Sequence, residues 1–152
     1  MLDLYEELAA IVDALESHEQ PYALCGGMAM AVHGFMRATV DIDLLVPADH
    51  ATAIEDIVAG LGYVVKAHPM TFGGGAVRIR RVSKIDTRDG DTMSVDLLLV
   101  TDASIGAWEA RERRMWRQGP MTIVSREGLI SLKRLRSSKQ DLADIERLET
   151  GE

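Results

Sequence analysis

Hydrophobic residues in the first part of the chain recur first at helical spacing and then in short continuous runs. Residues 2–19 place apolar side chains at helical spacing, which predicts an amphipathic helix with an acidic outer face. Pro21 ends this segment, and the apolar run 22–25 that follows is typical of a short buried strand. The next elements are expected to be a short helix, a strand over 41–47, and a helix over 49–62 with Asp49 as N-cap and Gly62 as C-cap.

The rest of the chain has the pattern of strands around a hairpin turn, followed by helices. "TRDGDT" is a hairpin turn signal, and the run before it alternates apolar and basic residues as a half-exposed strand does. The expected elements are a weak strand over 63–66, a mobile glycine-rich loop over 68–75, strands over 76–82, 93–100 and 120–124, and helices over 107–118, 125–136 and 138–148. This order predicts an α+β fold, with a mixed sheet flanked by helices and further helices at the C-terminus. The length of 152 residues fits a single domain, residues 1–152.

Charge is spread unevenly along the chain, whose formal net charge is −7. Residues 1–60 carry eleven acidic side chains and one basic side chain, Arg37, whereas residues 61–152 carry sixteen basic and thirteen acidic ones. This asymmetry suits a metal site that faces a polyanion, and solvated helix faces explain it equally well. No apolar run is long enough to span a bilayer, and the first residues lack the positive charge of a secretory signal. We therefore expect no membrane association and a cytoplasmic location.

Two aspartates interrupt an apolar run in which a buried strand is expected. In "DIDLLV", Asp41 and Asp43 are two residues apart, so their side chains share one face of a strand. Two adjacent carboxylates repel each other and lose hydration, so a cation is expected beside them. Asp96 lies in a similar run, and if its strand is a neighbour, three carboxylates meet in a site suited to Mg²⁺ and phosphoryl transfer. The spacing alone is weak evidence, because "DGD" in the hairpin turn has it too.

Gly26 and Gly27 stand between the first expected strand and the short helix. A Gly-Gly turn lets the backbone approach a ligand closely, and the start of the following helix directs free N–H groups toward it. Such a turn suits the phosphates of a nucleotide. A tight strand-to-helix turn without any ligand is the alternative, and it is the better explanation wherever no Asp-x-Asp follows.

The string "LCGGMAMAVHGFMRATVDIDLLV" (24–46) resembles the signature of the nucleotidyltransferase fold, the DNA polymerase beta-like superfamily. That signature is an apolar residue, Gly-Gly or Gly-Ser, a spacer, and Asp-x-Asp between apolar residues. The pattern "G-x-x-R-x-T-x-D-I-D" and the tail "LISLKRLRSSKQDLADIERL" (129–148) resemble small bacterial nucleotidyltransferases related to abortive-infection toxins. Many relatives carry a serine at position 27, where this chain offers only a backbone N–H.

The resemblance implies a role for each matching residue. Gly26 and Gly27 would hold the triphosphate of a nucleoside triphosphate, and Asp41 and Asp43 would bind Mg²⁺, with Mn²⁺ as an alternative ion. Asp96 would be the third carboxylate, a metal ligand and a base for the attacking hydroxyl.

Three further residues are candidates for contacting the nucleotide. Arg37 precedes the metal-binding strand and would either neutralise phosphate or pair with a neighbouring aspartate. Lys133 and Asp141, on the two closing helices, match the family ending, although a charged helix face in solvent is the default interpretation.

The implied function is transfer of a nucleoside monophosphate from the triphosphate onto a hydroxyl of an RNA such as tRNA, of a protein, or of a small molecule. The enzyme would be the toxin of a toxin–antitoxin pair, with an antitoxin protein as partner. The alternative is a non-catalytic nucleotidyltransferase-like binding module or an antitoxin-type partner. The presence of the full set of three acids favours the enzyme. If the acceptor is RNA, the basic segments "RIRRVSKIDTR" and "RERRMWRQ" would hold its phosphates. An ordinary solvated strand face explains the first of these segments equally well.

Overall fold

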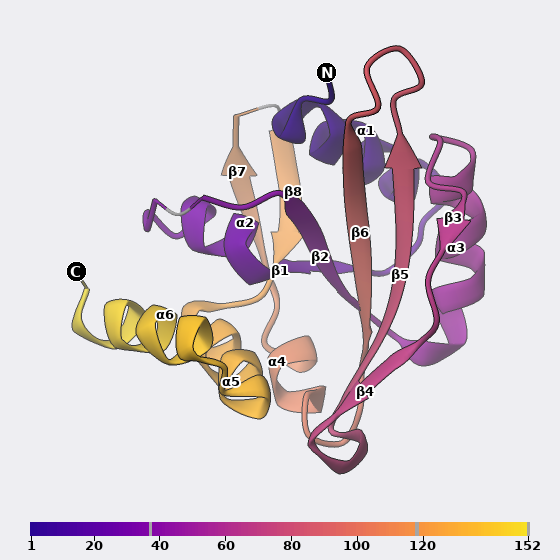
Figure 1. Ribbon diagram of the computed structural model, residues 1–152. Helices are drawn as coiled ribbons and strands as arrows, with labels where there is room; N and C mark the ends of the chain where they lie inside the picture. Colours follow the sequence, from indigo (N-terminus) through magenta and orange to yellow (C-terminus); the bar gives the residue numbers. More distant parts are fainter. Residues whose placement is uncertain (37, 118, 152) are drawn as a thin grey trace.

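The computed structural model describes residues 1–152 except 37, 118 and 152, and it is organised around one mixed β-sheet (Figure 1). Within the described residues the sheet has eight strands, in the order β3-β5-β6-β2-β1-β8-β7, with β4 also paired to β5. The strands are β1 (Ala23–Cys25), β2 (Asp41–Val46), β3 (Val65–Lys66), β4 (Met70–Phe72), β5 (Val77–Ile85), β6 (Thr92–Leu99), β7 (Glu112–Trp116) and β8 (Gly119–Ile123). The helices are α1 (Leu4–Ser17), α2 (Gly26–Val32), α3 (Ala51–Ala59), α4 (Ile105–Glu109), α5 (Arg126–Arg136) and α6 (Lys139–Thr150).

The strand directions confirm the predicted mixed sheet. β2 runs parallel to β6 and antiparallel to β1, while β1 runs parallel to β8. The predicted hairpin joins β5 to β6, and a second hairpin joins β7 to β8. The α+β class predicted from the element order is therefore confirmed, and the two closing helices lie at the C-terminus as expected.

Helices cover both faces of the sheet. Alternate side chains of β2 point to different faces, apolar on one side and acidic on the other. Ile42 and Leu44 are fully buried. Leu44 pairs with Leu97, which in turn pairs with Arg80, and Arg80 donates a hydrogen bond to Glu55 of α3. The apolar residues of β2 thus face α3 and α1, whereas α2, α4, α5 and α6 lie on the other side of the sheet (Figure 1). Because side chains alternate along a strand, the aspartates of β2 face that second side.

Helix α1 follows the predicted pattern closely. The carboxylate of Asp3 caps its start by accepting a hydrogen bond from the backbone N–H of Glu6. Leu8, Ile11 and Leu15 form its buried face, at the helical spacing seen in the sequence. Among the described residues no helix is both long enough and apolar enough to cross a membrane.

The predicted helix over 107–118 is wrong. Helix α4 ends at Glu109, and β7 begins at Glu112 and pairs with β8 from Glu112↔Ile123 to Trp116↔Gly119. The charged run "RERR" has high helix propensity, but it supplies no apolar stripe at helical spacing. Backbone pairing within a hairpin, together with the neighbouring strand β1, outweighs that weak local preference.

Smaller differences concern the ends of two elements. Residues 48–50 form a 3₁₀ turn before α3, so Asp49 is not the N-cap, and the helix ends at Ala59 with Gly60 rather than Gly62 as its C-cap. The expected loop over 68–75 contains β4, which pairs with β5, and a turn of three glycines. Pairing partners far along the chain create β4, and a local pattern does not reveal them.

Replacing Ile42 by alanine tests how firmly β2 is anchored beneath the aspartates. The side chain is fully buried, so Ile42→Ala is expected to lower the free energy of unfolding by about 2–5 kcal/mol through lost burial and the cavity left behind. Val40, two residues earlier, is 73% exposed, and Val40→Ala is the matched control, with an expected change of less than about 0.5 kcal/mol. Urea denaturation measures both. Equal losses would show that β2 is not held by its apolar face.

Candidate active site

Strand pairing aligns four side-chain positions in one row across the sheet. Cys25 of β1 pairs with Asp43 of β2, Asp43 pairs with Asp96 of β6, and Asp96 pairs with Arg81 of β5. Neighbouring strands lie about 4.8 Å apart, so the carboxylates of Asp43 and Asp96 are direct neighbours. Asp41 lies two residues before Asp43 and shares its face. We call Cys25, Asp43, Asp96 and Arg81 the cross-strand row.

The row opens into a cavity of about 190 Å³, here called the site cavity. It brings together all but one of the residues that the sequence singled out: Gly26, Gly27, Asp41, Asp43, Asp96, Lys133 and Asp141. The exception, Arg37, lies outside the described residues. Sequence reasoning did not select Thr39, Arg81 or Arg136 for this site, yet all three line it. Arg81 had been grouped with the basic segment around the hairpin, and only the register of β5 against β6 separates it from that group.

Arg81 forms a bidentate ion pair with Asp96, donating hydrogen bonds from two guanidinium nitrogens. Its Nε lies 2.7 Å from Oδ1 and its terminal nitrogen 2.9 Å from Oδ2, and the same terminal nitrogen lies 3.8 Å from Oδ2 of Asp41. Hydrogen bonding to Asp96 raises the pKa of the Arg81 guanidinium above its usual value. The Asp96 side chain is only 5% exposed, whereas that of Arg81 is 37% exposed. A largely buried carboxylate is thus neutralised by a cation that still reaches solvent.

Asp43 lies among other acidic side chains in a buried position. Burial raises the pKa of its carboxyl to about 7, and the nearby charges of Asp96 and Asp41 add to the effect. Burial also raises the pKa of Asp41, which Arg81 partly opposes. Burial raises the pKa of the Cys25 thiol as well, and this side chain is 1% exposed, as is typical of a cysteine that packs as a small hydrophobe.

The donor set fits a divalent cation of the Mg²⁺ type. The site cavity is lined by the carboxylates of Asp41, Asp43 and Asp96, whose oxygens are the ligands that hard cations prefer. Their mutual repulsion, seen in the raised pKa of Asp43, is the condition that such an ion would relieve. Nevertheless, no group of three His, Cys, Asp or Glu side chains in the described part of the chain is arranged closely enough to share an ion. Both oxygens of Asp96 are directed to Arg81 instead.

Gly26 begins α2 and fits tightly against Asp43. Its φ is +66°, a conformation that residues with a Cβ rarely adopt, and an added Cβ would overlap the carboxylate of Asp43. The backbone of the glycine turn therefore lies directly against the acidic end of the site. The sequence predicted this close approach from the Gly-Gly pair, although as an approach to a ligand.

Lys133 and Asp141 are buried, so the default expectation of a solvated helix face is wrong for both. Nζ of Lys133 lies 2.9 Å from Asp144 and 3.9 Å from Asp141. Asp141 also belongs to a capping box, because its carboxylate accepts hydrogen bonds from the backbone and hydroxyl of Ser138. Asp144 was missed, although its place one helical turn after Asp141 could have indicated a shared face.

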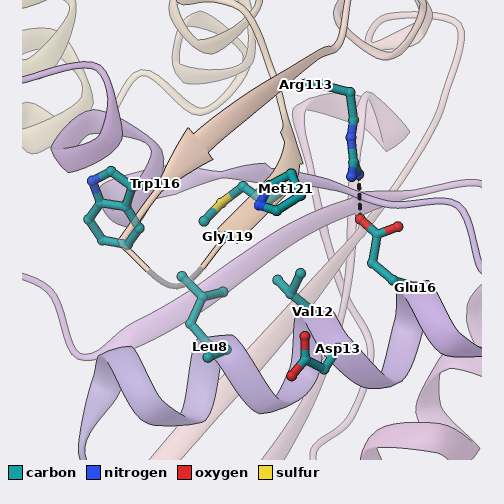
Figure 2. A pocket seen from close by; sticks show the side chains of 10 residues that line it. Leu8, Val12, Asp13, Glu16, Arg113, Trp116, Gly119 and Met121 are labelled. Atoms are coloured by element: carbon teal, nitrogen blue, oxygen red, sulfur yellow. Dashed lines mark hydrogen bonds and ion pairs between the residues drawn. The ribbon is translucent and has the colours of Figure 1, made fainter.

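Apart from Arg81, the basic segments do not gather around the site cavity. Arg80 binds Glu55, Arg88 binds Asp86, and Arg113 forms an ion pair with Glu16 of α1. A second cavity, of about 250 Å³, lies between α1 and the β7–β8 hairpin, with this last pair on its rim (Figure 2). It opens on the α1 side of the sheet, so it is separate from the carboxylates.

Comparison with known proteins places the fold and the family. The family model for aminoglycoside-2''-adenylyltransferase matches residues 7–97, which is more than half of the chain. A lincosamide antibiotic adenylyltransferase, LnuA, solved with lincomycin bound, superposes with a TM-score of 0.61 at 18% identity, covering 95% of this chain and 96% of that one.

Two more solved structures share the fold. ANT(2'')-Ia in complex with adenylyl-2''-tobramycin has a TM-score of 0.63 at 15% identity, covering 95% of this chain and 86% of its own. An antigenic nucleotidyltransferase-like protein from Paracoccidioides brasiliensis has a TM-score of 0.52 at 18% identity, covering 93% and 74%. No curated protein sequence gives a significant match. The predicted nucleotidyltransferase fold is confirmed.

Gly26→Ala is expected to destabilise the protein more than Gly34→Ala, in which the new side chain causes backbone strain but no steric overlap. The new Cβ would be strained by the positive φ and would also displace the carboxylate of Asp43. Gly34 has a φ of +95° with nothing within 4 Å of an added Cβ, so Gly34→Ala is the control for strain alone, about 1–3 kcal/mol. Urea denaturation should show a further loss of about 1 kcal/mol or more for Gly26→Ala. Equal losses would contradict the contact with Asp43.

Asp43→Asn is expected to stabilise the metal-free protein in a pH-dependent way. The folded carboxyl keeps its proton up to about pH 7, whereas an unfolded one releases it near 3.8. The wild type therefore loses stability as pH rises through this interval, and the asparagine variant does not. The free energy of unfolding is measured in urea with a chelator at several pH values. The value for Asp43→Asn should exceed that of the wild type by a small amount near pH 4 and by a larger, constant amount above about pH 7. Asp102→Asn, at an exposed position, is the control. An advantage that does not change with pH would contradict the raised pKa.

Proposed function

This chain belongs to the aminoglycoside-2''-adenylyltransferase family and is a nucleotidyltransferase, and we propose that it transfers a nucleoside monophosphate onto a hydroxyl of a small molecule. The donor would be a nucleoside triphosphate, pyrophosphate would leave, and Mg²⁺ or Mn²⁺ would be required. The observation that carries this proposal is the meeting of Asp41, Asp43 and Asp96 with the Gly26–Gly27 turn in one cavity.

Each residue of the site cavity has a chemical task in this proposal. Asp41, Asp43 and Asp96 would hold the ion. When bound, it supplies positive charge to the phosphate oxygens. The backbone of Gly26 and Gly27 would lie against the triphosphate, since no side chain at either position keeps it away.

The bond changes follow from these positions. The acceptor oxygen attacks the α-phosphorus and forms a new P–O bond, while the bond from the α-phosphorus to the pyrophosphate oxygen breaks. The proton of the hydroxyl passes to a carboxylate, for which Asp96 is our candidate. Lys133, at 6% exposure on the cavity wall, supplies positive charge to the leaving pyrophosphate, and Asp141 positions this lysine.

A cationic, hydroxyl-bearing small molecule is the acceptor that the charges support. The cavity presents four aspartates against three basic side chains, and the first sixty residues of the chain carry a large excess of acid. This excess of acid around the site favours a positively charged acceptor over a large polyanion such as RNA. The family description names an aminoglycoside, and structures of similar fold hold lincomycin or an adenylylated tobramycin.

The RNA acceptor, and with it a toxin that modifies tRNA, loses the support that the sequence seemed to offer. Strand β7 contains Arg113 and Arg114 and lies three strands away from β2, roughly 14 Å along the sheet. Arg113 is paired with an acid on the α1 side. These arginines are therefore not placed to hold an RNA end at the carboxylates.

An acceptor assay tests the proposal directly. The protein is incubated with Mg²⁺, one of ATP, CTP, GTP or UTP, and tobramycin, lincomycin, a mixed tRNA pool or a carrier protein. Pyrophosphate release and the mass of the product are measured. We expect release that depends on a small-molecule acceptor, whose mass rises by one nucleoside monophosphate. Asp43→Asn should reduce the rate by about a hundredfold or more.

Arg113→Ala combined with Arg114→Ala is the control and should leave turnover unchanged, because both side chains lie outside the site cavity. A product formed on tRNA alone, with loss in this double variant, would replace the small-molecule acceptor by RNA. An unchanged rate in Asp43→Asn would remove the carboxylates from the reaction.

A further inference from the structure

Arg81 lies at one end of the cross-strand row and places a positive charge beside its carboxylates. It reaches Asp96 through two hydrogen bonds of 2.7 and 2.9 Å and approaches Asp41 to 3.8 Å. A bidentate arginine–carboxylate pair is among the strongest and most directional polar contacts in proteins. Two of the three carboxylates of the site are thus shared with a cation that the chain itself supplies.

This pairing fixes the orientation of Asp96. Both of its oxygens accept hydrogen bonds from Arg81, so each has less acceptor capacity left for an ion. Among the described residues, no three acidic, histidine or cysteine side chains are arranged so that they could hold one ion. An ion that took Asp96 as a ligand would have to separate at least one of these hydrogen bonds.

Arg81 also has room to move. Its side chain is 37% exposed, whereas that of Asp96 is 5% exposed. Strand β5 is bordered on its outer side only by the short strands β3 and β4, which pair with it at residues 82–83 and 77–79. The guanidinium therefore has a path outward into solvent.

We propose that Arg81 is a positioning residue that competes with the divalent cation for Asp96, and more weakly for Asp41. Without the ion, Arg81 neutralises the crowded carboxylates and occupies both oxygens of Asp96. Binding of an ion by Asp41, Asp43 and Asp96 would require Arg81 to release Asp96. This inference rests on the proposed function, because it takes the three aspartates as the cation site.

A purely structural role is the competing explanation. The Arg81–Asp96 pair would then only hold β5 against β6, and its removal would destabilise the protein without favouring metal binding. The two explanations differ in one measurable quantity, which is the affinity of the nucleotide-free protein for a cation.

The experiment measures binding of Mn²⁺ to the full chain by calorimetry, after chelator treatment and without nucleotide. Arg81→Met removes the competing charge, so its Mn²⁺ affinity should exceed that of the wild type by about tenfold or more, the equivalent of one or two charged hydrogen bonds that need not be broken. Arg81→Lys retains the charge but cannot form a bidentate pair with Asp96, so its Mn²⁺ affinity should increase less. Arg80→Met is the matched control on the same strand, because Arg80 binds Glu55 on the opposite face.

Thermal unfolding gives a second measurement. The midpoint of Arg81→Met should lie below that of the wild type without metal and rise further on addition of Mn²⁺, because a ligand that binds more tightly stabilises more. If Arg81→Met does not fold, Arg81→Lys carries the comparison alone.

The outcomes separate this inference from the proposed function. An unchanged or weaker Mn²⁺ affinity in both Arg81 variants, with Mn²⁺ binding abolished in Asp43→Asn, would overturn the competition and leave the cation site standing. Absence of Mn²⁺ binding in the wild type and all variants, even with a non-hydrolysable nucleoside triphosphate, would overturn the proposed function, and the competition with it.

Discussion

The structure of the site depends on the repulsion between carboxylates that strand pairing forces together. Asp43 and Asp96 are register partners on adjacent parallel strands, and Asp41 shares their face. Their apolar neighbours hold β2 and β6 in the core, so the strands cannot separate to relieve the charge. Such a cluster is stable only if it is protonated or neutralised. Both responses are present, since the pKa of Asp43 is raised and Asp96 is held by Arg81.

The rest of the site is arranged around this cluster. Gly26 has no Cβ where one would overlap Asp43, so the turn into α2 lies against the acids. On the opposite wall, α5 brings in Lys133, which α6 holds through Asp144 and Asp141. A buried lysine requires acidic partners, and these partners fix the packing of α6 against α5. The helices at the C-terminus thus belong to the site as much as the strands do.

Comparison of the site cavity with the cavity beside α1 shows why chemistry, more than size, locates the site. The cavity between α1 and the β7–β8 hairpin is larger, but it combines apolar side chains with one ion pair on its rim (Figure 2). The smaller cavity holds the residues with raised pKa values, the glycine turn and three basic side chains. A cluster of titratable groups with shifted pKa values is a stronger indication of a functional site than the volume of a cavity.

The sequence by itself determined the elements whose signals are local. Apolar spacing gave α1, the turn residues gave the β5–β6 hairpin, and period-two placement put Asp41 and Asp43 on one face. Only the tertiary structure decided the partners of those elements. It turned the segment around Arg113 from an expected helix into β7, it buried Lys133, and it aligned Arg81 with Asp96. The physical reason is that register and ion pairing join residues distant in sequence, and a one-residue shift of a strand would direct Arg81 to the other face of the sheet.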